Sequence, residues 1–420
     1  MREEIRNFMN EMDAGLAGAA SSLPMIPTYL GAGNAEPYAK PILVIDAGGT
    51  NLRAASVRFT EAGLEVLDIV KRKMPGREGA ITAAQLFSEL VDTVEKVLSD
   101  ETELCGFCFS YPAEIQENHD GKIIAFSKDV EIEGAEGALI GASMNEELIR
   151  RGRKPLQFCV LNDTVATFFG GCSSLPEEAY DSVIGLILGT GINSCYMEQA
   201  EKIRKASSAS YDMLINIESA KFKKLEMKSF DLRLDENSAL PGDAWLEKKI
   251  SGAYFGDNVY YALLEACEMD AGTGNAEMSS ENAFDSAFCA RLREAGGIRT
   301  SEISLLTEDP YRNDLNGLCV TAEQKEAVMA VADQLIDRAA YLVVCHLAAV
   351  MEHCDSGKKR REPATIVVEG STWQKFHALR ERIIYYAHQI IGLEQGRYYR
   401  FCEVENSNLI GSAQAALACR

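Results

Sequence analysis

The chain has 420 residues and a formal net charge of −21 at pH 7. Hydrophobic residues make up 47% and charged residues 25%, which is typical of a globular protein and excludes extended disorder. The length is sufficient for two lobes with separate cores, and the acidic balance argues against nucleic acid or an anionic membrane surface as a partner.

The first 18 residues predict an amphipathic helix packed on the body of the protein. Acidic residues interrupt their apolar positions, so this segment lacks the apolar core of a signal peptide. The longest apolar stretch, residues 339–351, is too short to cross a bilayer and predicts a core helix. These features predict a cytoplasmic protein without a membrane partner. The positions of the N-terminal stripe are Ile5, Met9, Met12 and Leu16.

The 12 cysteines are scattered singly through apolar runs, which predicts free thiols in the core. The closest pair, Cys105 and Cys108, falls in a predicted strand, where an offset of three residues places the two thiols on opposite faces. There is no second CxxC pair and no neighbouring pair of histidines. The sequence therefore supports neither a zinc site nor a redox pair.

The most informative stretch covers residues 41–59. An apolar run at residues 42–45 predicts a strand buried on both faces, and Asp46 follows it directly. Residues 47–50 (AGGT) interrupt the run before a second strand begins at Leu52. The tip of such a hairpin exposes backbone N–H groups that bind anions, because glycine leaves the backbone accessible. The pattern predicts a phosphate-binding turn, with Asp46 placed to hold Mg²⁺ directly or through water.

A lone turn of this kind is more often an ordinary hairpin, but residues 182–198 repeat the pattern. An apolar strand leads to Gly189-Thr190-Gly191, and Asn193 and a second strand follow. Two copies, each opening a segment of mixed strands and helices, indicate a duplicated fold that clamps the phosphates of a nucleotide between two lobes.

The other predicted elements alternate between helices and short buried strands. Asp163 or Thr164 is the expected N-cap of the helix that begins at Val165, and residues 270–280 predict a surface loop. The alternation predicts an α/β fold with mainly parallel or mixed sheets. The predicted strands cover residues 104–111, 157–161, 213–217 and 365–368; the predicted helices cover 83–98, 165–169, 243–254, 258–268, 327–353 and 411–419, with one more from Trp373.

Nine segments together resemble one known family. In chain order they are LPMIPTY (23–29), IDAGGTNLR (45–53), FSYP (109–112), FSK (126–128), LNDTVAT (161–167), IGLILGTGINSCYME (184–198), INIE (215–218), PGDAWLEKKISGAYFG (241–256) and VEGSTW (368–373). On the basis of these segments, the chain resembles the hexokinase family from about Ser22 onward. The resemblance implies a two-lobed actin-like ATPase (ribonuclease H-like) fold with mixed sheets and a sugar cleft between the lobes. The small lobe would comprise residues 40–163 and 401–420, and the large lobe residues 1–39 and 164–400.

The resemblance implies that Asp163 is the general base that takes the proton of the sugar's 6-hydroxyl as this oxygen attacks the γ-phosphate of ATP. A carboxylate at a strand end is held rigidly, which suits a reaction that depends on positioning and charge neutralisation. Alone, Asp163 would be interpreted as a helix cap. Lys128 is implied as a second catalytic residue. The residues implied to hold the sugar are Ser127, Lys128, Asn162, Asp163, Asn193, Glu218 and Glu247.

The same resemblance implies a nucleotide site built from separate motifs. Asp46 would lie next to the Mg²⁺ ion. An arginine in a strand, such as Arg53, is more often part of a structural ion pair when it is considered alone. The implied residues are Asp46, Gly48, Gly49, Thr50, Asn51 and Arg53 in the first phosphate motif, Gly189, Thr190 and Gly191 in the second, Gly370 and Ser371 in the adenosine motif, and Gly252.

Three positions depart from the family pattern. Glu369 stands where the adenosine motif usually has aspartate, residues 219–221 (SAK) follow Glu218 in place of tryptophan–glycine, and Phe126-Ser127 replaces tryptophan–threonine. The resemblance predicts an ATP- and Mg²⁺-dependent hexokinase acting on D-glucose. A hexose-binding sensor with little turnover and a kinase that prefers another hexose stay open as alternatives.

Overall fold

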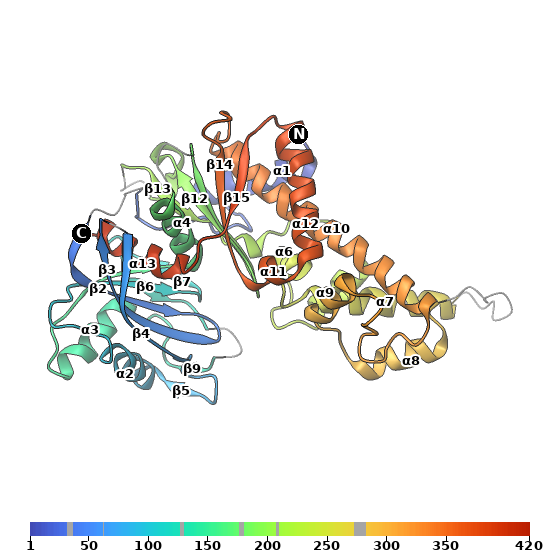
Figure 1. The fold of residues 1–420 in the computed structure, drawn as a ribbon, viewed down its shortest axis with the longest axis horizontal. Helices are drawn as coiled ribbons and strands as arrows, with labels where there is room; N and C mark the ends of the chain where they lie inside the picture. The colour runs from blue at the N-terminus through green and yellow to red at the C-terminus, as the bar shows by residue number, and fades with distance from the viewer. Residues whose placement is uncertain (32–36, 62, 127–129, 176–179, 207–209, 273–282) are drawn as a thin grey trace.

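The computed structural model describes residues 1–31, 37–61, 63–126, 130–175, 180–206, 210–272 and 283–420. Within these residues the chain forms two large mixed β-sheets with helices on their faces (Figure 1). The short pairs β5–β9 (Ile81–Thr82, Ile132–Glu133) and β7–β8 (Ala113–Ile115, Gly121–Ile123) accompany them. The predicted α/β class is confirmed.

The first sheet has the order β10-β6-β2-β3-β4. Its strands β2, β6 and β10 run parallel, and β3 and β4 extend the sheet as antiparallel neighbours. The β2–β3 hairpin is the predicted first glycine turn. The bounds are β2 (Tyr38–Ala47), β3 (Asn51–Thr60), β4 (Gly63–Lys73), β6 (Leu104–Phe109) and β10 (Gln157–Leu161).

The second sheet repeats this plan, with the order β1-β13-β12-β11-β14-β15. Here β11, β14 and β15 run parallel, and β12 and β13 are added antiparallel through the second glycine hairpin. The predicted duplication is therefore confirmed in the strand order of both sheets. The bounds are β1 (Ile26–Pro27), β11 (Val183–Leu188), β12 (Ile192–Glu198), β13 (Met213–Asn216), β14 (Ala364–Glu369) and β15 (Tyr399–Cys402).

Two helices, α4 (Asp163–Ser174) and α13 (Ser407–Ala418), pack against each other between the sheets. Their approach depends on small residues. A Cβ on Gly411 would lie 1.8 Å from the carbonyl oxygen of Ala166, and one on Gly106 of β6 would lie 2.0 Å from that of Ser412. A core of residues from both sheets and both helices surrounds this contact, so α4 and α13 connect the two halves.

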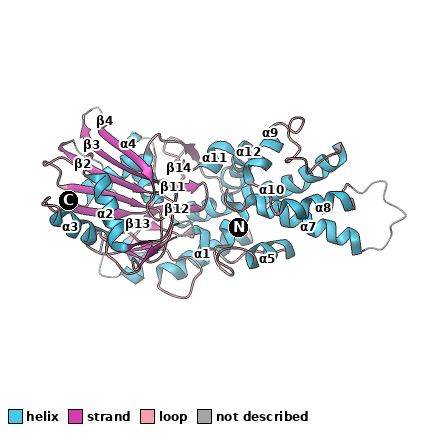
Figure 2. Cartoon of the chain, turned by 90° about the horizontal axis from the view of Figure 1, so that it is seen from below, coloured by secondary structure: helices cyan, strands magenta, loops and turns pink. Residues whose placement is uncertain are grey.

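The remaining helices lie outside this central contact, and not all of them cover a sheet. Figures 1 and 2 show α7, α8 and α9 grouped with the far end of α10, away from the sheets. The bounds are α1 (Glu3–Leu16), α2 (Ala83–Val94), α3 (Ile140–Arg150), α5 (Ser229–Glu236), α6 (Trp245–Ile250), α7 (Phe255–Gly272), α8 (Ser286–Ala295), α9 (Thr300–Glu308), α10 (Ala322–His353), α11 (Ser371–Lys375) and α12 (His377–Ala387).

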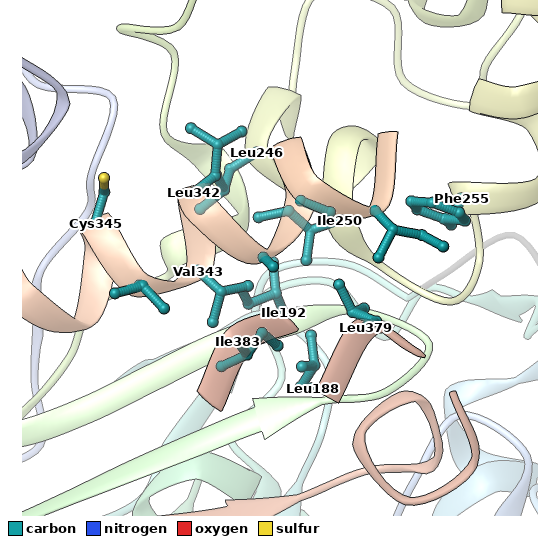
Figure 3. Packing of buried hydrophobic residues seen from close by; sticks show 14 of the residues in the cluster. Leu188, Ile192, Leu246, Ile250, Phe255, Leu342, Val343, Cys345, Leu379 and Ile383 are labelled. Atoms are coloured by element: carbon teal, nitrogen blue, oxygen red, sulfur yellow. The ribbon is translucent and has the colours of Figure 1, made fainter. Parts of the chain in front are cut away.

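The second glycine turn is anchored by the large core. Leu188 and Ile192, which flank the turn, are buried and belong to the same hydrophobic cluster as side chains of α6, α10 and α12 (Figure 3). Burying an apolar side chain of this size stabilises a fold by roughly 1.5–3 kcal/mol. Two such side chains therefore anchor the turn to the hydrophobic core. Neighbours in the cluster include Leu246, Ile250, Val343, Leu379 and Ile383.

Two sequence predictions about helix ends were wrong. The N-cap of α4 is Asn162, whose Oδ1 accepts a hydrogen bond from the backbone N–H of Thr164 at 3.0 Å. Asp163 is thus the first helical residue, and its carboxylate is not used as the cap. Helix α7 continues to Gly272, so the first part of the predicted loop at 270–280 is helical, and the rest of that loop lies outside the described residues.

The prediction that every cysteine is free was also wrong. Cys267 of α7 and Cys289 of α8 form a disulfide, with their Cα atoms 5.8 Å apart. The two helices pack against each other, a pairing that a separation of 22 residues does not reveal. Cys105 and Cys108 do contribute to different cores on opposite sides of β6, as predicted. Among the helices that the structure describes, none combines the length and apolar composition needed to cross a bilayer.

Candidate active site

Acidic side chains from both sheets converge where strands end. Asp46 lies near the end of β2, Glu369 ends β14, and Asp163 and Glu218 follow closely after β10 and β13. Three of these carboxylates raise the pKa of the fourth, Asp163, through their negative charge. The four groups therefore share one electrostatic environment.

The pKa of Asp163 is strongly altered by this environment. Burial raises its pKa to about 7, the charge of Glu369 adds to this rise, and a hydrogen bond from Ser110 opposes it. The residue remains partly accessible. A carboxylate with a pKa near the working pH is suited to accept a proton from a substrate. Ser110 was not singled out from the sequence, although it lies inside the FSYP segment.

A network of amides surrounds Glu218. The Nδ2 of Asn193 donates to Oδ1 of Asn216 at 2.9 Å and lies 3.3 Å from both Oε1 of Glu218 and Oδ1 of Asn162. The Nδ2 of Asn216 donates to Oε1 of Glu218 at 2.8 Å. The structure thus brings together three predicted sugar-site residues and adds Asn216, which sequence reasoning missed although it lies in the INIE segment.

An uncharged histidine contacts the residues that follow two members of this network. The Nε2 of His346 lies 2.6 Å from Oγ of Ser194 and 3.1 Å from Oγ of Ser219, the residues that follow Asn193 and Glu218. Complete burial lowers the pKa of His346 to about 4, so its imidazole is uncharged at neutral pH. The backbone at Glu218 has φ 58°, a left-handed conformation that turns its side chain into the network and costs strain.

Glu247 connects the sugar-site residues to the second glycine turn. Its Oε2 accepts the backbone N–H of Ile192 at 3.3 Å, and a Cβ on Gly191 would lie only 2.4 Å from that oxygen. Burial raises the pKa of Glu247 to about 7, and the charge of Glu218 contributes. A Cβ at residue 191 would therefore displace this carboxyl group from its present position.

Three predicted nucleotide motifs meet at Gly189. Its carbonyl oxygen accepts the backbone N–H of Gly252 at 2.9 Å and the hydroxyl of Thr372 at 2.7 Å. Gly370 has φ 126°, and a Cβ there would lie 2.4 Å from the carbonyl oxygen of Leu188. Gly252 has no room for a Cβ either, since Oγ1 of Thr372 would be 2.4 Å away. The three loops therefore form one surface of closely packed backbone.

The first hairpin turn presents exposed backbone beside a cation. Gly49 and Thr50 are exposed, and the turn is closed by a hydrogen bond from the N–H of Gly48 to the carbonyl oxygen of Asn51 at 3.0 Å. The guanidinium of Arg77 donates to the carbonyl oxygen of Gly49 at 2.6 Å. Arg77 was missed from the sequence, because it lies in a polar loop with no motif of its own.

Asp46 and Arg53 form an ion pair across the β2–β3 hairpin. The strand register places them opposite each other, and Nε of Arg53 donates to Oδ2 of Asp46 at 2.9 Å. This confirms the ion-pair interpretation of Arg53. Among the described residues, no group of three or more histidine, cysteine or acidic side chains is arranged to hold a metal. The carboxylate of Asp46 is a ligand type that Mg²⁺ accepts, directly or through water.

Two predicted site residues, Ser127 and Lys128, lie outside the described residues. The residue before them, Phe126, packs its ring against Phe109 and Tyr111 at centroid distances of 5.8 and 5.0 Å. This aromatic cluster holds Phe126, the residue before Ser127, against the core.

Comparison with known proteins now identifies the family. Two hexokinase family profiles match the chain, one over residues 1–173 and the other over residues 183–418. The chain belongs to the hexokinase family. Hexokinase-1 of Schizosaccharomyces pombe is 27% identical, with 97% of this chain and 85% of the relative covered. Hexokinase-3 of Homo sapiens is 29% identical over 97% of this chain and 44% of its own length.

Solved structures show the same fold. A hexokinase from Schistosoma mansoni complexed with glucose superimposes with a TM-score of 0.78 at 23% identity, covering 99% of this chain and 94% of that chain. A ROK family glucokinase from Streptomyces griseus in complex with glucose and AMPPNP gives a TM-score of 0.51 at 15% identity, covering 90% of this chain and 99% of that chain. The predicted actin-like ATPase fold is confirmed. As a hexokinase, the protein is a phosphotransferase that acts on a sugar.

The structure gives a physical reason for one departure from the hexokinase pattern. The carboxylate of Glu369 accepts a hydrogen bond from Ser407, at the start of α13, and lies 3.5 Å from Oγ1 of Thr167 in α4. Burial raises the pKa of Glu369, and the charge of Asp46 adds to this. In this hexokinase, residue 369 therefore ties the end of β14 to both central helices and faces the acidic cluster.

Proposed function

We propose that the protein transfers the γ-phosphoryl group of ATP to the 6-hydroxyl of D-glucose, with Asp163 as the general base. The observation that carries the proposal is the position of Asp163, which lies at the start of α4 between the amide network and the glycine turns. This is where a sugar hydroxyl and a terminal phosphate would have to meet.

The amide network is suited to hold the sugar. A carboxamide can donate to one hydroxyl of a pyranose and accept from its neighbour, and a carboxylate can accept from two neighbouring hydroxyls. In the proposal this role belongs to Asn162, Asn193, Glu218 and Glu247, with Asn216 fixing the orientation of the Asn193 and Glu218 side chains. Ser127 and Lys128 keep the sugar-binding and catalytic roles that the resemblance implies.

The proton transfer follows from the environment of Asp163. The 6-hydroxyl gives its proton to the Asp163 carboxylate while its oxygen bonds to the γ-phosphorus. The bond from that phosphorus to the bridging oxygen breaks, and ADP leaves. A carboxylate surrounded by three others has a raised proton affinity, which makes it a stronger base than an exposed aspartate.

The nucleotide would lie between the two glycine hairpins. Backbone N–H groups at Gly189, Thr190 and Gly191, together with those of the first turn, would cradle the phosphates. The nucleoside part of ATP would lie against the loops of Gly252, Gly370 and Ser371, because these loops present backbone without bulky side chains. Bound Mg²⁺ would neutralise phosphate charge next to Asp46. Arg77 adds a positive charge beside the first turn.

Lobe closure is part of the proposal, because a kinase must keep its phosphoryl donor away from water until the sugar is bound. The proposed division places residues 40–163 and 401–420 in the small lobe and residues 1–39 and 164–400 in the large lobe. Of its three boundaries, the one at 39/40 lies near the start of β2 and the one at 163/164 lies at the start of α4. The boundary at 400/401 lies within β15, which pairs with β14.

The test of this function is sugar-dependent formation of ADP. Purified protein with MgATP is assayed with glucose, fructose, mannose and no sugar, and glucose binding is measured separately by calorimetry. We expect turnover with glucose and little ADP without sugar. Turnover with another hexose alone would change the proposed substrate, and binding of glucose without turnover by any sugar would favour the sensor alternative.

The charge of Glu369 is expected to set the pH range of activity. With the pKa of Asp163 at about 7, kcat/KM at pH 6 should be about one tenth of its value at pH 8, because the base must be deprotonated. Glu369→Gln removes the charge that contributes most to this shift after burial. The pKa of Asp163 should then fall, so the ratio of kcat/KM at pH 6 to that at pH 8 should rise.

Steady-state kinetics between pH 5.5 and 9 check this expectation. Glu394→Gln, which removes an exposed carboxylate paired with Arg2, serves as the control and should leave the profile unchanged. An unchanged profile in Glu369→Gln would show that Asp163 does not limit the acid side of the rate.

A further inference from the structure

The edge strands of the two large sheets differ greatly in length. Three of the four edges are formed by β1, β15 and β10, which have 2, 4 and 5 residues. The fourth edge is β4, which has 11 residues and, in the part of the chain that the structure describes, pairs with β3 alone. Figure 2 shows β4 as the outermost strand of its sheet. A long edge of this kind presents a row of backbone N–H and C=O groups with which another strand can pair.

The hydrogen bonds around β4 show which of its backbone groups point outward. The N–H of Met74, directly after the strand, donates to the carbonyl oxygen of Thr50, directly before β3, at 3.0 Å. The N–H of Ile69 donates instead to Oδ1 of the neighbouring Asp68 at 2.8 Å. Because bonded and unbonded residues alternate along an antiparallel ladder, the backbone groups of Ile69 and Lys71 point away from β3. They are therefore placed to bond to a further strand.

The side chains of β4 leave an apolar surface at this edge. Every residue of the strand is at least partly exposed. Leu64, near its start, packs against the core around α13, whereas Val66, Leu67 and Ile69 are 45, 41 and 39% exposed. Adjacent exposed apolar side chains are typical of an interaction surface. None of these residues belongs to the candidate active site, so the surface has a separate role.

Charged side chains often protect an edge strand from pairing, but those of β4 are segregated along the strand. Glu65 and Asp68 come first, and Lys71, Arg72 and Lys73 follow. Two parallel copies would place like charges together, whereas antiparallel copies place the acidic part of each strand beside the basic part of the other. Such local complementarity is needed, because the net charge of −21 repels two copies of the chain at long range.

Asp68 and Arg72 are suited to meet across such an interface. The register of β4 is regular between them, and their even separation places both on the same face of the sheet. Asp68 is exposed. Arg72 pairs with Glu89 of its own chain at 2.5 Å, but the two side chains remain 36 and 33% exposed. A guanidinium has five N–H donors, so this pair leaves donors for a second carboxylate.

We propose that β4 is the interface of a symmetric dimer, in which it pairs antiparallel with β4 of a second copy of this chain. The two-fold axis passes beside Val70, so Ile69 of each copy exchanges backbone hydrogen bonds with the partner's Lys71. Asp68 then lies opposite the partner's Arg72, twice in each dimer. The two five-stranded sheets become one, and the assembly closes at two copies because each copy uses the same strand.

The charges of β4 favour this register over its neighbours. A two-fold axis at Asp68 would place two carboxylates opposite each other, and an axis at Lys71 would place two ammonium groups opposite each other. An axis at Ile69 would place Asp68 opposite the apolar Val70 and would separate it from Arg72. The axis at Val70 avoids all three arrangements.

The mass of the full-length protein in solution tests the dimer. Analytical ultracentrifugation is run over a range of protein concentrations. The mass should rise from that of one chain to that of two and then stay constant. A single chain at every concentration would overturn the proposal and leave the edge to a different partner. Growth beyond two copies would also overturn it, because a closed pair leaves no β4 edge free.

Ile69→Pro tests the backbone pairing. Proline lacks the N–H, and the N–H of Ile69 is not used in the ladder with β3, so an edge position of this kind tolerates the substitution. The dissociation constant of the dimer should rise at least about tenfold, since two hydrogen bonds between the copies are lost. Ile69→Val keeps the N–H and is the matched control, which should dimerise as the wild type does. Equal dissociation constants for Ile69→Pro and the wild type would overturn the assignment of β4.

Asp68→Lys and Arg72→Glu test the register. Each variant alone should dimerise at least about tenfold more weakly than the wild type, because like charges face each other at both ends of the pairing. An equimolar mixture of the two should recover the wild-type dissociation constant to within about threefold, since every substituted side chain then faces an opposite charge. A mixture that dimerises no better than its components would overturn the register. A thermal melt shows whether each variant folds, and the concentration dependence of the wild type decides if any does not.

Discussion

Asp163→Asn is expected to lower turnover by about 10²–10⁴-fold, the usual contribution of a general base, while glucose still binds. The substitution keeps the shape of the side chain and removes its negative charge and its ability to accept a proton. It also leaves the start of α4 in place, because the helix is capped by Asn162 rather than by Asp163. The variant therefore tests catalysis with less disturbance of the fold than removal of the side chain would cause.

The measurement has two parts, a coupled assay of ADP formation for kcat and calorimetry for glucose binding. Asp68→Asn on the exposed strand β4 is the matched control, since it makes the same chemical change far from the acidic cluster. We expect normal turnover in the control. Near-normal turnover in Asp163→Asn would reject the assignment of the base, and loss of glucose binding together with turnover would assign Asp163 to sugar binding alone.

The glycine turns were predictable because their signal is local. Gly48 and Gly49, and Gly189 and Gly191, each interrupt an apolar run that is long enough to be a buried strand, so both hairpins could be placed from the pattern alone. Their repetition predicted a duplicated fold, which the similar strand order of the two sheets confirms. The resemblance then supplied the roles of Asn193, Glu218 and Glu247, which no local pattern distinguishes from ordinary polar residues.

The residues that were missed depend on contacts between distant segments. Asn216 is identified only when β12 and β13 pair and bring its amide to Asn193. Arg77 reaches the first turn from a loop without a motif, and Cys267 meets Cys289 only because α7 and α8 pack together. The N-cap of α4 was misplaced by one or two residues, because Asn162, Asp163 and Thr164 are all good caps and the sequence offers no way to choose among them.

Asn193→Ala is expected to raise the KM for glucose about 100-fold with a smaller effect on kcat. Asn193 is the hub of the amide network, and it also accepts the backbone N–H of Ser219 at 3.2 Å. Its loss would leave Asn216, Glu218 and Asn162 without a shared donor. Leaving buried polar groups unpaired costs about 1–3 kcal/mol, and 1.4 kcal/mol corresponds to tenfold in affinity.

We expect the substitution to affect KM more than kcat because of the groups that the network would contact. In the proposed function it would hold hydroxyls that do not react, so it should stabilise the bound sugar and the transition state about equally, and its loss should appear mainly in KM. Asn145→Ala is the matched control, because Asn145 is also partly buried and makes two hydrogen bonds to Leu156. Both variants should lower the melting temperature, but only Asn193→Ala should raise the KM. An equal rise in both would mean that the network stabilises the fold and does not bind the sugar.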